Sequence, residues 1–370
     1  MFTTALVTVL LLQKVVAAPT PTSSSSEGVY TLVSDHSGTD FFSGFKFESI
    51  TDPTQGYVRY VNTSVAQHEK LAGYIFNSTN SASTAYLGVD HSSTNLTSSG
   101  RKSTRITSYN KYSNGALVVA DIRHMPLGVC GTWGALWMTG DNWPHSGEID
   151  IIEGVNDNQF NSMTLHTSAG CSVSNETSTP MLGRLGSISD CDGLKNNNAG
   201  CGISAPEQAN LAGGVSHPTA GSAFNAAGGG VYAMHWTAKG INIYLFPHNL
   251  VPNDLASGSP DPSSWTAQPL ARFAGNDCDY AKKFSAQAIT INTDLCGEWA
   301  GNVWNQTSCA TQTGFATCEE FVKKRPDLLK EAYWEIGGVK VFQTEVGTVD
   351  GPGKGMVKRD VVGRWPIVRL

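Results

Sequence analysis

The strongest constraint on the fold is a long succession of short segments rich in β-branched and aromatic residues, which begins at Val29. Clusters of Gly, Asn, Asp and Ser separate these segments, and such clusters are typical of turns between strands. Representative segments are "GYVRYV", "ALVVADIRH", "SMTLHTS", "INIYLFP" and "VKVFQTE". Their spacing favours an antiparallel sandwich or barrel over alternating strand and helix units, so we predict an all-β fold.

One helical stretch stands out near the end of the chain. Thr317 and Glu320 form a capping-box pattern that opens "CEEFVKK", and Pro326 stops the stretch. We therefore predict a short helix in this position, followed by a last strand around Val339 to Gln343.

The two ends of the chain differ in composition from the middle. Residues 1–17 are interpreted as a signal peptide, because their apolar run ends at Leu12, too short to span a bilayer, and small residues suited to cleavage follow. Residues 18–28 form a Pro/Ser/Thr-rich leader that cannot build a core. We place one domain at residues 29–345 and expect residues 346–370, rich in Gly and charge, to form a disordered tail.

Other features fit export from the cell. The eight cysteines are even in number, no C-x-x-C pair occurs, and we expect up to four disulfides rather than a zinc site, with the pairing left open. Five Asn-x-Ser/Thr sequons could carry glycans: Asn62, Asn77, Asn95, Asn175 and Asn305. The net charge of −6 and a charged fraction of 15% speak against a nucleic-acid or anionic-membrane partner. We expect a secreted monomer.

The segment "GEIDIIEGVN" concentrates acidic residues in an apolar context. On a regular strand Glu148 and Asp150 would share one face and Glu153 would lie on the other, while a helix would leave the two glutamates roughly 140° apart. One extra residue bulging out between Asp150 and Glu153 would turn all three carboxylates to the same side and leave Ile149 in the core. The alternative is a solvated strand face, which like-charge repulsion and the poor strand propensity of Asp and Glu disfavour.

Such a cluster suits cleavage of a glycosidic bond. Two carboxylates about 5 to 5.5 Å apart can act as a nucleophile and an acid/base with retention of configuration, and crowding of like charges keeps one of them protonated. Five tryptophans could supply flat faces for sugar rings, although each one taken alone is more often a core residue: Trp133, Trp137, Trp143, Trp299 and Trp304. We expect Trp143, in the polar stretch "DNWPHSG", to line a cleft.

Several motifs together resemble a known family: "GTWGALWM", "GDNWPHSGEIDIIEGVND", "MTLHTSAGC", "CGEWAG" and "AYWEIGGVKVFQ". They look like the family-16 glycoside hydrolases, in particular fungal secreted endo-β-1,3(4)-glucanases or laminarinases, over about Val29 to Gln343. The resemblance implies a β-jelly-roll sandwich of two antiparallel sheets with a concave substrate cleft. It also implies that Glu148 is the nucleophile, Glu153 the acid/base and Asp150 their helper. By the same resemblance, the residues in contact with glucose units would be Arg105, Trp137, Trp143, His166 and Trp299.

The sequence thus predicts an endo-acting, retaining hydrolase of β-1,3 linkages, and of β-1,4 linkages next to them, in β-glucan polysaccharides, with no cofactor and no metal. Two alternatives remain at this point: a cell-wall glucan transglycosylase and a non-catalytic β-glucan-binding protein. The chain lacks the shorter, unbulged E-x-D-x-E pattern typical of lichenases and wall transglycosylases. A binding protein would not need both Glu148 and Glu153.

Overall fold

The computed structural model of the chain describes residues 28–77, 82–94, 96, 100–174, 180–275, 277–345, 349–350 and 365–370. The expected signal peptide, nearly all of the expected leader and the sequons at Asn95 and Asn175 lie outside the described residues. These expectations remain predictions.

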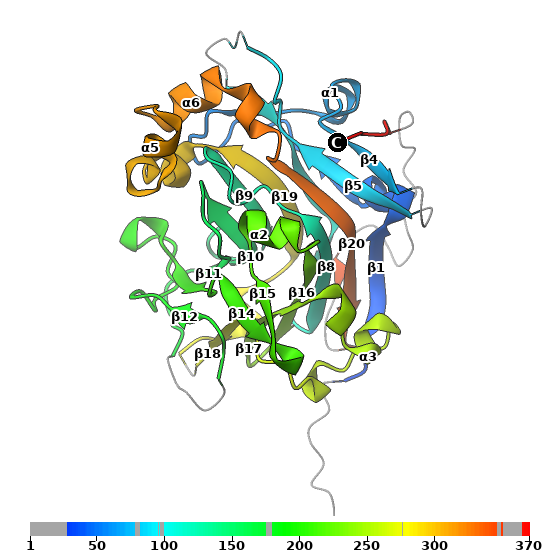
Figure 1. Cartoon of the computed structure of the whole chain (residues 1–370). Helices are drawn as coiled ribbons and strands as arrows, with labels where there is room; N and C mark the ends of the chain where they lie inside the picture. Colours follow the sequence, from blue (N-terminus) through cyan, green and yellow to red (C-terminus); the bar gives the residue numbers. More distant parts are fainter. Residues whose placement is uncertain are drawn as a thin grey trace, which may run out of the picture.

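Two antiparallel sheets packed face to face form the body of the molecule (Figure 1). The first has eight strands: β18 (Ala271–Ala274), β17 (Gly240–Phe246), β16 (Gly230–Thr237), β8 (Ala116–His124), β20 (Tyr333–Gln343), β5 (Ala82–Gly88) and β4 (Ala72–Asn77) in this order, with β1 (Thr31–Ser37) also paired to β20. The second has nine: β12 (Arg184–Leu185), β13 (Cys201–Ser204), β11 (Ser162–His166), β10 (Glu148–Val155), β9 (Thr132–Thr139), β19 (Gln287–Leu295), β7 (Arg105–Tyr112) and β2 (Phe45–Phe47), with β21 (Val349–Asp350) on β7. The prediction of an all-β jelly-roll sandwich is confirmed.

Smaller elements connect and cover the sheets. Two short pairs accompany them, β14 (Gln208–Leu211) with β15 (Val215–Pro218) and β3 (Val58–Tyr60) with β6 (Arg101–Ser103). The α-helices are α1 (Thr63–His68), α2 (Gly221–Ala226), α3 (Asn253–Ala256), α4 (Tyr280–Lys283), α5 (Cys309–Thr313) and α6 (Cys318–Lys324). The tighter turns are η1 (Gly38–Gly44), η2 (Asn196–Asn198), η3 (Ala212–Gly214), η4 (His248–Leu250), η5 (Pro262–Ser264), η7 (Trp304–Gln306) and η8 (Pro326–Leu329), with a π-helical turn at η6 (Gly297–Gly301).

The main core lies between the sheets, where alternate residues of each strand point inward. Ile149 and Ile152 of β10 pack there with fully buried aromatic side chains such as Trp236 and Trp334. A second apolar cluster, which includes Tyr244 and Leu255, covers the other face of the eight-stranded sheet beneath α3. The other face of the nine-stranded sheet is therefore the one that remains available for a cleft.

The predicted C-terminal helix is confirmed as α6. The Thr317 side chain accepts a hydrogen bond from the backbone N–H of Glu320 at 3.3 Å, which satisfies one of the free donors in the first helical turn. Figure 1 shows α5 and α6 together at one end of the sandwich.

The cysteines form four disulfides, as the sequence predicted, and none is free. The pairs are Cys130–Cys309, Cys171–Cys278, Cys191–Cys201 and Cys296–Cys318. Within the described residues, no helix combines the length and the apolar character that a membrane crossing requires.

The expectation of a disordered tail is wrong for the described parts of residues 346–370. Val349 and Asp350 pair with β7, and Trp365 stacks on Phe42 with ring centroids 4.1 Å apart. Val368 donates a backbone hydrogen bond to Tyr74 of β4 at 2.8 Å. The Gly-rich composition conceals this docking, because the apolar run "WPIV" is short.

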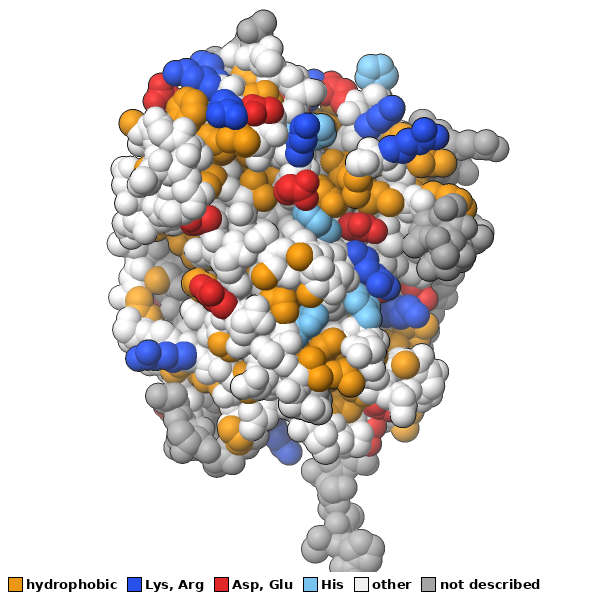
Figure 2. Space-filling model, in the orientation of Figure 1, with side chains coloured by type: hydrophobic (Ala, Val, Ile, Leu, Met, Phe, Trp, Pro, Cys, Tyr) orange, Lys and Arg blue, Asp and Glu red, His pale blue; other side chains and the backbone are white. Residues whose placement is uncertain are grey.

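Figure 2 shows basic, acidic and apolar side chains scattered among uncharged ones over the face in view. No large patch of like-charged side chains dominates this face, in agreement with the modest net charge of −6.

Candidate active site

The acidic segment forms β10, and its pairing with β9 contains the predicted bulge. Glu148, Asp150 and Glu153 oppose Thr139, Trp137 and Ala135, which are alternate residues of β9, and the register shifts between Asp150 and Ile152. Because alternate residues of β9 share one face, the three carboxylates share it too. Ile151 is the additional residue, and it remains buried.

A cavity of about 950 Å³ opens above these carboxylates on the face of the nine-stranded sheet. All the residues that the sequence singled out line this one cavity: Glu148, Asp150, Glu153, Arg105, Trp137, Trp143, His166 and Trp299. The structure therefore brings the predicted set together, from β7, β9, β10, β11 and the loops around them. The role of each residue remains a prediction.

The two glutamates are both biased toward protonation, to different degrees. Burial, and secondarily the charge of Asp150, raises the pKa of Glu148 to about 7, although His166 and a hydrogen bond with Trp143 oppose the rise. Burial and Asp150 raise the pKa of Glu153 well above its ordinary value, against the effect of a hydrogen bond from Trp133. Both carboxyl groups therefore favour the protonated form more than an exposed glutamate does.

His166 lies across from Glu148 in the sheet and forms an ion pair with Asp150, Nε2 to Oδ2 at 3.4 Å. Burial lowers the pKa of His166, but the surrounding carboxylates outweigh burial and raise the pKa to about 9. A protonated His166 partly neutralises the cluster. Glu148, Asp150 and His166 also place one possible ligand atom each within 4.8 Å of one another, a spacing that could hold a cation.

Aromatic side chains frame the cavity on the β9 side. The Trp137 indole N–H donates to Asn292 Oδ1 at 2.7 Å, and the Arg105 guanidinium lies 5.0 Å from the Trp137 ring centroid. Trp299 meets Trp133 edge to face with centroids 5.7 Å apart. These contacts hold the rings in place at the cavity.

Trp143 stands at the rim of the cavity and is 39% exposed. The backbone of Gly193 passes so close that a Cβ there would lie 3.1 Å from the Trp143 ring. A large apolar side chain that stays exposed beside a polar cavity is available to a ligand.

Sequence reasoning missed residues whose importance depends on pairing in space. The sequence offers Trp133 only as one of several possible platforms, but its indole N–H donates to Glu153 Oε1 at 2.8 Å. Asn161 hydrogen bonds to the backbone on both sides of Ile152. Neither position carries a local pattern that indicates these contacts. For Asn161, its place directly before β11 is the only signal, and it is a weak one.

A turn of three consecutive asparagines, Asn196–Asn198, forms the wall of the cavity opposite the β9 side. Their φ angles are +50°, +54° and +57°, so all three adopt the left-handed conformation that Asn tolerates better than most residues. The Cys191–Cys201 disulfide closes the loop that carries them. We call Asn196–Asn198 the asparagine turn.

An antiparallel jelly roll with paired carboxylates on a bulged strand beneath an open cavity defines a class, the glycoside hydrolases that use two carboxylates. Residues 45–342 match the family profile described as XgeA-like, catalytic GH16 domain, and the chain belongs to this glycoside hydrolase family.

Named relatives come from fungi. A probable endo-1,3(4)-β-glucanase of Aspergillus fumigatus is 42% identical over 318 residues, which are 85% of this chain and 45% of the relative. The chain thus spans about half the length of that relative.

Solved structures of similar proteins support the same family assignment. Laminarinase 16A from Phanerochaete chrysosporium, with β-glucans in its donor and acceptor sites, is 39% identical with a TM-score of 0.72, over 85% of this chain and 100% of that chain. An elongating GH family 16 β-1,3-glucosyltransferase is 40% identical, with the same TM-score of 0.72 and the same coverage, 85% and 100%.

Proposed function

We propose that the chain is an endo-acting, retaining glycoside hydrolase that cleaves β-1,3 linkages, and β-1,4 linkages next to them, in glucans. In this mechanism Glu148 attacks the anomeric carbon while Glu153 donates its proton to the departing oxygen, which gives a glycosyl-enzyme. Glu153 then takes a proton from water, and the water releases the sugar with its original configuration.

The observation that carries the proposal is the bulge, which puts Glu148 and Glu153 on one face beneath the same cavity. The raised pKa of Glu153 supports its role, because a general acid must hold a proton when the reaction begins. Asp150 and His166 would tune the pKa values of both glutamates through their charges. We further propose that the tryptophan rings and Arg105 contact glucose units, as in a site that stacks sugar faces on aromatic platforms.

Incubation with laminarin, lichenan, cellulose and xylan, followed by a reducing-end assay, tests the proposal. We expect release of reducing ends from laminarin, and from lichenan if adjacent β-1,4 linkages are also cleaved. Activity on xylan alone would contradict it.

A second candidate is transfer to a sugar hydroxyl in place of water, since the glucosyltransferase of similar structure is described as elongating. Sizing of the products distinguishes the two, because oligosaccharides longer than the substrate appear only with transfer. A purely glucan-binding role predicts neither kind of product.

We also propose that the protein is secreted. Four disulfides are typical of an oxidising compartment, and a polysaccharide too large to enter a cell would be met outside it. Mass analysis of the culture medium, with the N-terminus of the mature chain read directly, tests both export and cleavage near Ala17.

A further inference from the structure

The bulge in β10 leaves backbone groups without a strand partner on the β11 side. Pairing with β11 runs from Glu148 opposite His166 to Asp150 opposite Thr164, and it stops there. The next residues of β10 are the bulged Ile151, then Ile152, and then Glu153, the expected acid/base. A buried peptide group without a partner is destabilising, so something else must take the place of β11 here.

The side chain of Asn161 fills this place. Its Oδ1 accepts a hydrogen bond from the Glu153 N–H at 2.9 Å, and its Nδ2 donates to the Ile151 carbonyl at 2.9 Å. Asn161 is fully buried, and its own carbonyl accepts from the Ala205 N–H at 2.9 Å. The amide thus presents one acceptor and one donor to β10, as a peptide group of a neighbouring strand would.

We propose that Asn161 is a positioning residue for the reaction, acting through Glu153. This inference rests on the proposed function, because it assigns Asn161 the task of holding the acid/base where the glycosidic oxygen would lie. Glu153 is then fixed at two points: Asn161 holds its backbone, and Trp133 holds its carboxyl group at 2.8 Å. A misplacement of about 1 Å at such a group can cost on the order of 100-fold in rate.

The chemistry of the amide makes this position selective. A carboxylate in place of the amide could still accept from the Glu153 N–H, but it could not donate to the Ile151 carbonyl and would face it with like partial charge. We therefore expect Asn161→Asp to preserve shape and to loosen the bulge.

The test compares two substrates whose need for Glu153 differs. In laminarin the leaving group is a sugar hydroxyl, which must be protonated as it departs. In dinitrophenyl β-laminaribioside the leaving group is dinitrophenolate, which departs without a proton. For Asn161→Asp we expect kcat on laminarin to fall on the order of 100-fold with KM changed less than about threefold, while formation of the glycosyl-enzyme from the aryl glycoside falls less than about threefold.

Asn225 offers a matched control at a distance from the cavity. Its Oδ1 accepts from the Met125 N–H at 2.9 Å and its Nδ2 donates to the Met125 carbonyl at 3.0 Å, so it braces backbone in the same manner. Asn225→Asp should lower stability without distinguishing the two substrates.

Asn161→Ser, which leaves room for a bridging water, repeats the comparison if Asn161→Asp accumulates poorly. A selective loss on laminarin in either Asn161 variant supports the inference. An equal loss on both substrates, as partial unfolding alone would give, overturns it. If the unaltered chain cleaves neither substrate, the proposed function fails and takes the inference with it.

Discussion

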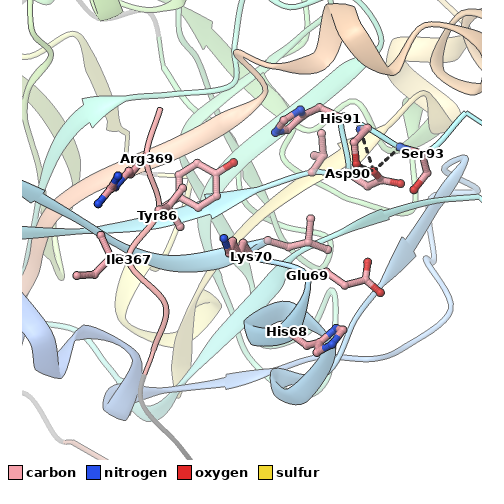
Figure 3. A pocket seen from close by; sticks show the side chains of 13 residues that line it. His68, Glu69, Lys70, Tyr86, Asp90, His91, Ser93, Ile367 and Arg369 are labelled. Carbon is pink, nitrogen blue, oxygen red and sulfur yellow. Dashed lines mark hydrogen bonds between the residues drawn. The ribbon is translucent and has the colours of Figure 1, made fainter.

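Two hollows on this molecule use the same kinds of side chain in opposite ways. The active-site cavity holds carboxylates that crowd one another, and the pKa of Glu148 rises to about 7. A second hollow of about 720 Å³, which we call the edge cavity, lies between α1, the loop after β5 and the C-terminal segment (Figure 3). There Asp90 accepts hydrogen bonds from the backbone N–H groups of Ser92 and Ser93, both at 3.0 Å.

The difference lies in how each carboxylate is neutralised. Burial alone would raise the pKa of Asp90, but those hydrogen bonds and the nearby Arg101 outweigh burial and lower the pKa. Glu69, also at the edge cavity, is paired with Lys102. A carboxylate whose partners stabilise its charged form serves the structure, whereas crowded carboxylates with raised pKa values indicate proton-transfer chemistry. The size of a hollow does not distinguish these cases.

The largest effect should come from replacing the expected catalytic glutamates. Glu148→Gln and Glu153→Gln should each lower hydrolysis of laminarin by a factor on the order of 10³ or more, because each removes a group that forms or breaks a bond. Because Gln has the size of Glu, circular dichroism should show folded protein in both cases. Full activity in both variants would show that these two glutamates do not carry the reaction.

Azide and an activated substrate separate the two roles. In Glu148→Gln, azide can attack the vacated face and give a product of inverted configuration. In Glu153→Gln the glycosyl-enzyme still forms, and azide then gives a product of retained configuration. The opposite stereochemistry would require the two roles to be exchanged.

Asp90→Asn should have the reverse profile, a loss of stability without a loss of activity. It leaves the fully buried Arg101 without the carboxylate that lies 3.5 Å away, and breaking a buried ion pair costs about 3 kcal/mol. Folding lowers the pKa of Asp90. The stabilisation is therefore fully present at pH values above the ordinary pKa of an Asp side chain, and it is lost as the pH falls through the lowered pKa of Asp90 in the folded protein. Urea unfolding at pH 7 and kcat of the folded fraction measure both effects. A tenfold fall in kcat would contradict the division between the hollows.

The sequence could predict the parts of the site that have a local signature. The bulge followed from the five-residue interval between Glu148 and Glu153, because no regular strand or helix puts both on one face. The sandwich followed from short strands separated by turn residues. The set around the cavity followed from resemblance, since nothing in the sequence alone places Arg105 beside Trp137.

Other parts depend on contacts between distant segments and could not be predicted. The disulfide Cys130–Cys309 joins residues 179 positions apart, and sequence spacing gives no basis for that choice. Asn161 matters because it replaces a missing strand partner, which exists only once β10 and β11 have paired. The stacking of Trp365 on Phe42 could not be predicted, because the residues around Trp365 have the composition of a tail.

A smaller effect should come from Asp150→Asn. Asp150 raises the pKa of both Glu148 and Glu153, so its neutralisation should lower both values and move both limbs of the pH profile of kcat/KM to lower pH. Loss of a charge-assisted contact should also reduce kcat about tenfold at the original optimum. Profiles of laminarin hydrolysis from acid to alkaline pH measure the shift. Limbs that stay in place, or move to higher pH, would show that Asp150 does not set these values.

The smallest effect should come from the asparagine turn, which lies before β13, two strands from β10 in the sheet. Asn196–Asn198 are exposed beside the cavity, and no hydrogen bond among the described residues engages their side-chain amides. These amides can therefore bind hydroxyl groups of a glucan chain that extends past β11. Glycine accepts a φ of +54° without strain, and Asn197→Gly should therefore remove the amide and keep the backbone. We expect kcat/KM to fall about threefold to fivefold for long laminari-oligosaccharides and to stay unchanged for the shortest ones, because only long chains reach the turn.

Lys70→Gly, at a φ of +57° beside the edge cavity, is the matched control and should leave kcat/KM unchanged at every chain length. A loss that is independent of chain length would mean that the turn acts on the fold of the cavity rather than on the glucan.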